Sequence, residues 1–287
     1  MSLIIKSAAF TPIEFSESSQ ALNVANCFNE LAPVLARQTN KVLGDIAQAE
    51  IARHFLCSTM LELPFTSGAA SLADVNGDNC EDSPYSSFIN TYECASWGYS
   101  LRYYLKQVPD SRYLLVSILD ANVLGLNFWK QNENWGKSGF GLCTFLLEVN
   151  QDEPEAKQDG SADNTIGNLI TANCAVTYNS TPEFATIIRR MVTGKDDITL
   201  ALPFFPENIR QIFTRMLGGF KQLPDLHDRW GHCFGSDPWL SIINQGVTQG
   251  FQESTKILAC SIALNGYYCM AEVTANAQSR FYLEDAA

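Results

Sequence analysis

The feature that most limits the fold is a pair of almost continuously apolar segments of strand length. The first spans Tyr113–Leu119, and the second runs from Phe140 to Val149, directly after Gly139. A strand that alternates apolar and polar residues keeps one face in water, whereas a strand that is apolar throughout needs cover on both faces. The two segments therefore predict a mixed α/β protein with buried strands.

Apolar spacing and turn residues predict further elements on both sides of these strands. The elements expected in the first half are a strand over 3–12, a helix over Ala21–Ala47, an apolar helical segment over Gln48–Met60, a strand over about 86–92 and a helix ending near Gln107. Those expected in the second half are strands over Leu169–Tyr178, Ile198–Leu202, Ile257–Ala263 and Tyr267–Val273, with helices over Thr181–Val192 and Pro206–Leu217.

Residues 150–164 are acidic, rich in turn formers and without apolar periodicity. Such a stretch is typical of a connection between structural units. We therefore predict an N-terminal half over 1–150, an acidic linker over 151–163 and a C-terminal half over 164–287. Both halves alternate strands with helices, which indicates a duplicated architecture, although no internal sequence repeat supports it.

The composition excludes several classes of protein. The net charge of −12 and the pI near 4.7 argue against binding to nucleic acid or to an anionic membrane surface, since both need a cationic footprint. No apolar run reaches the length of a membrane-spanning helix, and the first residues lack the pattern of a signal peptide. The loop Asp74–Glu81 imitates a calcium loop but lacks its glycine and its glutamate, so no metal or bound cofactor is predicted.

Nine cysteines, an odd number without a CxxC pair, indicate neither a disulfide framework nor a zinc ribbon. Buried thiols in a reducing cytoplasm account for eight of them. Cys94 is the exception, because a β-prone run gives way at this residue to helical spacing. A thiol at a helix N-terminus faces unpaired N–H groups and the positive end of the helix dipole, and both favour the thiolate. This elbow predicts a nucleophile.

Three histidines limit the choice of a catalytic base. His54 lies in an apolar pattern and is interpreted as structural. His232 is flanked by glycines in Gly231-His232-Cys233-Phe234-Gly235, followed by the helix-start sequence Ser236-Asp237-Pro238. We therefore pair His232 with Cys94. Asp237, Asp225 and Asp228 are each near enough in sequence to orient the imidazole, and Asp237 could equally cap the helix.

The order of these features resembles that of the thiolase-like condensing enzymes, with the nearest resemblance to β-ketoacyl-acyl carrier protein synthase III. The resemblance rests on the elbow Asn90–Leu101, the strand over 113–119, the Gly139–Leu142 entry to the next strand, Gly231-His232 and Asn265-Gly266. It covers most of the chain at low similarity, and the order of the motifs carries it.

The resemblance implies a five-layered αβαβα fold of two similar halves, usually dimeric. It makes Cys94 the residue that takes an acyl group from a thioester. His232 matches a position that is asparagine in synthase III and histidine in thiolases. The N–H groups of Cys94 and Gly266 would form the oxyanion hole. The substrate would be a thioester of acyl carrier protein or coenzyme A, with no other cofactor.

Two departures from the family pattern bear on the reaction. Phe205 stands where synthase III has a second catalytic histidine, and Phe140 stands within the motif that is Gly-Asp-Gly-Ala in the family. Ordinary decarboxylative condensation relies on two polar side chains beside the cysteine, so these departures leave open whether the chain retains that reaction. Trp97, Phe140 and Phe205 are candidates to line an acyl tunnel.

Two hypotheses follow. The first is an acyltransferase or condensing enzyme of specialised biosynthesis that passes the acyl group from Cys94 to a carbon, nitrogen or oxygen acceptor. The second is a non-catalytic subunit that pairs with an active synthase III-like chain. A homodimer fits the first hypothesis and a heterodimer the second.

Overall fold

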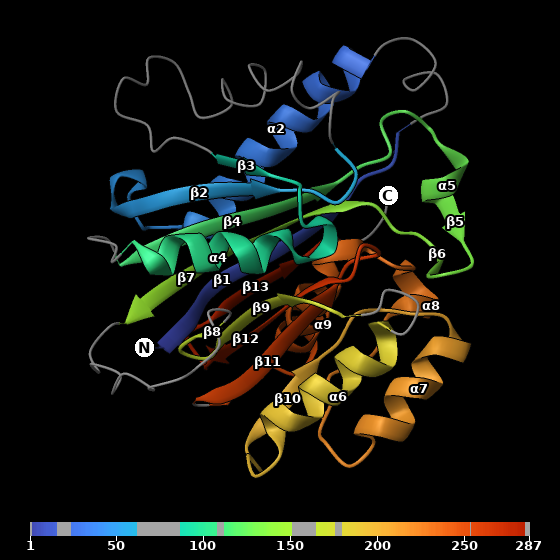
Figure 1. Cartoon of the computed structure of the whole chain (residues 1–287). Coiled ribbons are helices and arrows are strands. Elements are labelled where there is room, and N and C mark those ends of the chain that lie inside the picture. Colours follow the sequence, from blue (N-terminus) through green and yellow to red (C-terminus); the bar gives the residue numbers. More distant parts are fainter. Residues whose placement is uncertain are drawn as a thin grey trace.

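The computed structural model describes residues 2–15, 24–61, 87–107, 112–150, 165–175, 180–252 and 254–284. The predicted acidic linker over 151–163 and the calcium-like loop over 74–81 lie outside the described residues. Figure 1 shows five layers, from α2 at the top through the β2, β4 and β7 strands, α4, and the β9 to β12 strands, to α6 and α7 at the bottom. This arrangement is the predicted α/β layering.

Strands from residues 2–150 and from residues 165–283 join in one hydrogen-bonded set. Its spatial order is β10 (Ile198–Ala201), β11 (Thr255–Ile262), β12 (Tyr267–Ala275), β1 (Ser2–Pro12), β7 (Gly141–Asn150), β4 (Tyr113–Asp120), β2 (Ile51–Cys57) and β3 (Ser87–Ile89). Three more strands attach beside this path, namely β13 (Arg280–Leu283) on β1, β9 (Leu169–Asn173) on β12, and β8 (Thr165–Ile166) on β9. A separate short hairpin pairs β5 (Gln131–Asn132) with β6 (Gly136–Lys137).

Helices cover these strands. The longer ones are α2 (Val24–Leu43), α4 (Ser96–Lys106), α6 (Ser180–Val192), α7 (Glu207–Leu217) and α9 (Asp237–Thr248). The short ones are α5 (Asn127–Lys130), α8 (His227–Trp230) and the 3₁₀ turns η1 (Gln48–Glu50), η3 (Glu93–Ala95) and η5 (Phe234–Ser236). None of the helices in the described part of the chain combines the length and the apolarity needed to span a membrane.

The two apolar segments form the strands predicted from them. Residues Leu114–Asp120 of β4 and Gly141–Val149 of β7 are all buried, as expected for strands covered on both faces. The two strands pair antiparallel, and β7 also pairs antiparallel with β1. The apolar runs therefore predicted both the secondary structure and its burial.

Other predictions need correction. Residues 51–57, expected to be helical, form strand β2 between β3 and β4, because parallel pairing with both neighbours outweighs the apolar spacing. Helix α2 ends at Leu43 rather than Ala47, since Gly44 has a φ of +58°, a value that ends a helix. Strand β13 was not predicted at all, and its pairing with β1 joins residues more than 270 positions apart in sequence.

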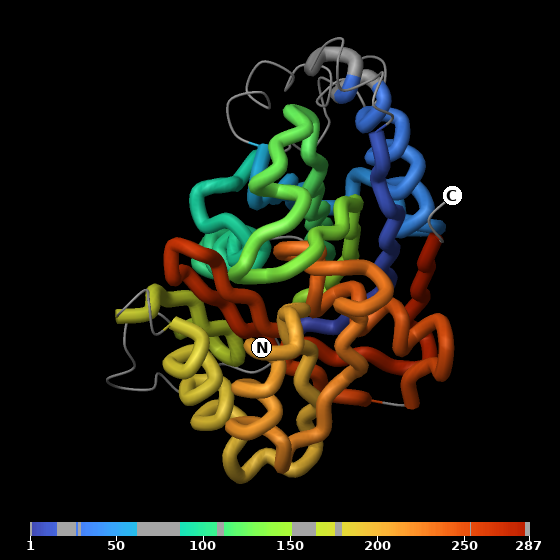
Figure 2. The backbone as a smooth tube through the Cα atoms, turned by 90° about the vertical axis from the view of Figure 1, so that its right-hand side faces the viewer, coloured from blue at the N-terminus to red at the C-terminus, as the bar shows by residue number. Residues whose placement is uncertain are grey.

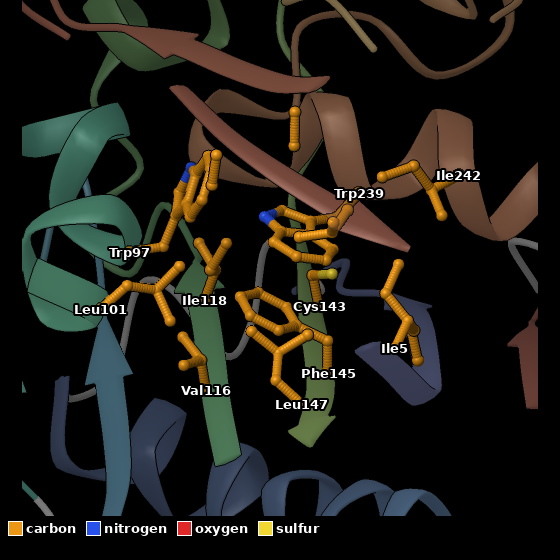
Figure 3. Packing of buried hydrophobic residues seen from close by; sticks show 14 of the residues in the cluster. Ile5, Trp97, Leu101, Val116, Ile118, Cys143, Phe145, Leu147, Trp239 and Ile242 are labelled. Atoms are coloured by element: carbon orange, nitrogen blue, oxygen red, sulfur yellow. The ribbon is translucent and has the colours of Figure 1, made fainter. Parts of the chain in front are cut away.

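The centre of the core is aromatic (Figure 3). The rings of Trp239 and Phe145 stack with their centroids 3.5 Å apart. Trp97 meets both rings edge to face, and its Nε1–H donates to Ser261 Oγ at 2.9 Å. These side chains come from α9, β7, α4 and β11, so the cluster ties both middle helices to strands of both halves.

The close approach of α4 to β12 gives a test of this packing. A Cβ at Gly98 would lie 2.2 Å from Cys269 Cβ, so Gly98→Ala should destabilise the protein by about 1 to 3 kcal/mol. Gly219 provides the matched control, because nothing lies within 4 Å of a Cβ placed there. Denaturant unfolding of the two variants measures the difference, and equal stabilities would show that α4 can move away from β12 without cost.

Candidate active site

Cys94 lies at the turn between strand β3 and helix α4. It is the middle residue of η3, and its side chain is 5% exposed. The preceding residue, Glu93, has a φ of +46°, an uncommon backbone conformation for a residue other than glycine. Glu93 Oε2 accepts a hydrogen bond from the N–H of Leu264 at 3.0 Å, which ties the elbow to the β11–β12 turn. The predicted strand-to-helix elbow is present.

Three other polar side chains lie behind the thiol. The hydroxyl of Thr59, just after β2, donates to Cys94 Sγ at 3.6 Å. Asp120, the last residue of β4, is 1% exposed and accepts the Thr59 N–H at 2.6 Å and the Ser58 hydroxyl at 3.2 Å. The ends of β2 and β4 therefore place a carboxyl group and two hydroxyls in the interior beside Cys94.

His232 and Asp237 form a second buried pair. His232 Nδ1 lies 2.6 Å from Asp237 Oδ2 and 2.9 Å from the carbonyl oxygen of Phe204. Asp237 also accepts the N–H groups of Phe204 and Cys233, at 2.8 and 2.6 Å. Two backbone N–H groups thus hold the carboxylate in place beside the imidazole.

These contacts fix the tautomer of the neutral imidazole. Both partners of His232 Nδ1 are acceptors, so Nδ1 carries the hydrogen and Nε2 carries the lone pair. Among the described residues no hydrogen-bond partner is recorded for Nε2. The imidazole therefore has the orientation of a general base whose free nitrogen is available to a reacting group.

One cavity of about 430 Å³ brings the thiol and the imidazole together. The turn η3, which carries Cys94, contacts η5, which begins two residues after His232, and also contacts β11 and β12. Figure 2 shows these segments in teal, orange and red. Most of the wall is aromatic or aliphatic, and Glu93 is its one acidic side chain among the described residues. The lining residues are Thr59, Glu93, Cys94, Trp129, Asn134, Trp135, Ser180, Thr181, Phe205, Ile209, His232, Phe234, Ile262, Ala263 and Leu264.

Burial governs the ionisation of the thiol. Desolvation raises the pKa of Cys94 well above its usual value, the negative charge of Asp120 raises it further, and the Thr59 hydrogen bond opposes both. The helix dipole invoked from the sequence is therefore outweighed in this structure. Cys94 needs a base to take its proton, and His232 is the base on the same cavity.

Of the two residues predicted to form the oxyanion hole, one lines the cavity and the other does not. Cys94 lines it, whereas Gly266 lies in the β11–β12 turn beyond the lining residues Ala263 and Leu264. The N–H of Gly266 already donates to the carbonyl of Ala263 at 3.0 Å. A role for Gly266 in binding an oxyanion would require this turn hydrogen bond to be shared or broken.

The three residues predicted to line an acyl tunnel lie in three different places. Phe205 lines the cavity and stacks on the His232 ring with centroids 5.7 Å apart. Phe140 stacks on Phe234 with centroids 6.3 Å apart and lines another cavity, of about 410 Å³. Trp97 is fully buried in the core, so the structure does not place it on the cavity.

The other histidines and carboxylates considered from the sequence lie elsewhere. His54 is buried on β2, and burial lowers its pKa to about 4, which fits the structural role predicted for it. Asp225 accepts the N–H of His227 and lies 3.4 Å from Arg210. Asp228 lies 3.6 Å from the same arginine. Of the three candidate carboxylates, Asp237 is the one at His232.

Sequence reasoning missed Thr59, Asp120 and the two tryptophans of the wall, Trp129 and Trp135. A signal for the first two exists, because each follows or ends a buried strand, and β2 and β4 are parallel. Parallel strands end at one edge of a sheet, where polar residues commonly form sites. The tryptophans come from α5 and the β5–β6 turn, whose position next to Cys94 no local pattern reveals.

The layered α/β architecture is the thiolase-like fold, and solved structures match it along nearly the whole chain. The acyltransferase ChlB3 has a TM-score of 0.66 and 14% identity, over 97% of this chain and 99% of that one. The priming β-ketosynthase of the R1128 polyketide pathway has a TM-score of 0.64 and 8% identity, over 96% of each chain. A 3-oxoacyl-(acyl-carrier-protein) synthase III has a TM-score of 0.61 and 11% identity, over 95% and 99%.

No protein-family model matches the sequence, and a comparison with curated proteins gives no match. At identities of 8 to 14% these structures establish the fold, while one fold serves many reactions. The reaction must therefore be argued from the residues of this chain.

Proposed function

We propose that the protein is a thioester-dependent acyltransferase in which Cys94 is the nucleophile, His232 the general base and Asp237 the residue that orients the base. One observation carries this proposal. The thiol and an imidazole with a free Nε2 border the same cavity, and a buried carboxylate lies 2.6 Å from Nδ1 of that imidazole. This is the order of groups found in nucleophile–histidine–acid triads.

The reaction has two halves. His232 Nε2 takes the thiol proton, the sulfur attacks the carbonyl carbon of the donor thioester, and a tetrahedral oxyanion forms. The carbon–sulfur bond of the donor then breaks, and its thiolate receives the proton from Nε2. In the second half Nε2 takes the proton of the acceptor, which attacks the acyl-cysteine and releases the Cys94 sulfur, and the sulfur regains the proton.

Phe205 favours an oxygen or nitrogen acceptor over a carbon acceptor. Decarboxylative condensation produces an enolate that needs polar donors beside the cysteine. Here the ring of Phe205 stacks on one side of His232, and the face of the cavity that it forms offers no such donor. A hydroxyl or amine acceptor needs one base, which His232 supplies. ChlB3, a solved structure of similar fold, is named as an acyltransferase.

We propose a carrier-protein or coenzyme A thioester as donor. One similar structure is named as a 3-oxoacyl-(acyl-carrier-protein) synthase III, which supports the carrier-protein thioester. We further propose a homodimer in a cytoplasmic location. The Cys94 and Gly266 N–H groups are kept as the proposed oxyanion hole, with the Gly266 turn opening as the oxyanion forms.

Intact-mass measurement tests the proposal. Incubation with a panel of acyl thioesters should add the mass of one acyl group, and Cys94→Ala should remove that adduct. Cys260→Ala is the matched control, since Cys260 is also buried but lies in β11, away from the cavity, and this variant should still be acylated. If no donor acylates the protein and it copurifies with a second synthase-like chain, the non-catalytic subunit is the better interpretation.

A further inference from the structure

The hydroxyl hydrogen of Thr59 has two possible acceptors, the Cys94 sulfur and the Asp120 carboxylate. Thr59 Oγ1 lies 3.6 Å from Cys94 Sγ and 3.4 Å from Asp120 Oδ2. A hydroxyl donates one hydrogen bond, so it cannot serve the sulfur and the carboxylate fully at the same time. Nothing in the proposed acyl transfer uses either Thr59 or Asp120.

The other contacts of Asp120 hold it at this position. Its Oδ1 accepts the Thr59 backbone N–H at 2.6 Å and the Ser58 hydroxyl at 3.2 Å. The Ser58 hydroxyl oxygen in turn accepts the N–H groups of Met60 and Leu61. The segment after β2 is therefore folded around the carboxyl group, which leaves Oδ2 facing the Thr59 hydroxyl.

We propose that Thr59 and Asp120 are positioning residues that act on the Cys94 thiolate in opposite directions. The Thr59 hydroxyl stabilises the thiolate by donating to the sulfur, and the charge of an ionised Asp120 opposes this stabilisation. A protonated Asp120 can donate to Thr59 Oγ1, which leaves the Thr59 hydrogen for the sulfur. An ionised Asp120 competes for that hydrogen and repels the negative sulfur. The inference concerns ionisation of the thiol, so it stands even if the proposed acyl transfer fails.

The surrounding groups make Asp120 ionise at a lower pH than Cys94, so the thiolate forms beside a charged carboxylate. Burial raises the pKa of Asp120 to about 6, against the opposing hydrogen bonds from Thr59 and Ser58 and the charge of His232. On the sulfur side, Glu93 from η3 and Asp237 from α9 also raise the pKa of Cys94, so the thiolate has several negative neighbours. Of the interactions that shift the pKa of Cys94 here, the Thr59 hydrogen bond is the one that lowers it.

Alkylation of Cys94 across pH tests the inference without any acyl donor. Iodoacetamide is small enough for the cavity, and the modified Cys94 peptide is quantified by mass spectrometry. Thr59→Val keeps the shape but loses the hydroxyl, so the alkylation midpoint should rise by about one pH unit, while Thr59→Ser should stay near the wild type. Asp120→Asn removes the charge and can donate to Thr59 Oγ1, so its midpoint should fall by about one pH unit.

The opposite shifts expected for the alkylation midpoints of Thr59→Val and Asp120→Asn distinguish this role from a merely structural one. A loosened site would move both midpoints in the same direction, and that result would overturn the inference, as would a Thr59→Ser midpoint equal to that of Thr59→Val. Cys94 left unmodified at every pH in all variants would overturn it too. Repeating the series with His232→Gln removes the imidazole, and the two shifts should persist with their signs unchanged.

The experiments distinguish failure of the proposed acyl transfer from failure of the control of Cys94 by Thr59 and Asp120. If no thioester acylates Cys94 but the opposite shifts are found, acyl transfer is refuted and the control of the thiol stands. If Cys94 is acylated but the Thr59 and Asp120 variants share one midpoint with the wild type, the acyl transfer stands and the control is refuted.

Discussion

Asp237→Asn should slow acyl transfer by about 10³- to 10⁴-fold, the size of effect seen when the acid of such a triad becomes an amide. The carboxylate accepts two backbone N–H groups, from Phe204 and Cys233, and its Oδ2 lies 2.6 Å from His232 Nδ1. An asparagine has one oxygen, so in either orientation its own N–H group would face a donor. The imidazole would lose its fixed tautomer, and Nε2 would no longer be reliably free to accept a proton.

Single-turnover measurements with the thioester that acylates Cys94 provide the rate, and thermal unfolding provides the stability. Both are needed, because Asp237 also holds two backbone N–H groups. Asp225→Asn is the matched control, since Asp225 also accepts a backbone N–H but lies away from His232. It should leave the rate within about twofold. Equal losses in the two variants would remove Asp237 from the proposed triad.

Trp239→Ala should destabilise the protein by about 3 to 5 kcal/mol, the usual cost of removing a buried tryptophan. The side chain is fully buried, stacks on Phe145 and meets Trp97 edge to face (Figure 3). Rigid strands and helices from both halves surround it, so the space it leaves cannot close without moving them. Denaturant unfolding followed by far-UV circular dichroism measures the loss.

A milder substitution at the same position checks the cause. Trp239 Nε1 has no hydrogen-bond partner in the described part of the chain, so Trp239→Phe sacrifices volume but no recorded hydrogen bond. We expect it to cost about 1 to 2 kcal/mol. If phenylalanine cost as much as alanine, the indole would contribute through something other than the space that it fills.

The sequence was informative where burial is continuous or where a turn interrupts a periodic pattern. The apolar runs identified β4 and β7, and the change from strand to helical spacing located the elbow at Cys94. Residues 51–57 were misread, since a short apolar segment can serve as a strand or as a helix. The neighbours β3 and β4 decide between the two, and pairing with them is invisible to local spacing.

Some residues of the site are likewise indicated by local sequence signals, whereas others are brought together only by the fold. The glycines around His232 and the helix start at Asp237 are local signals, and the structure places these two side chains 2.6 Å apart. Spacing left Asp225, Asp228 and Asp237 as open alternatives, because the fold decides which carboxylate reaches Nδ1. Thr59 and Asp120 are separated by 61 residues and meet only because β2 and β4 end side by side. No pattern within either segment shows that meeting.

Strand β1 has a consequence for how the molecule is made. It pairs with β7 along one edge, and on the other it meets β13 between Ser7 and Phe10 and β12 at Ile4. Strand β1 therefore waits for residues more than 270 positions later in the sequence to be synthesised before its hydrogen bonds are complete. Contacts that span so much sequence slow folding, and until β13 is available the nascent chain carries an unpaired strand edge, the kind of surface that chaperones shield.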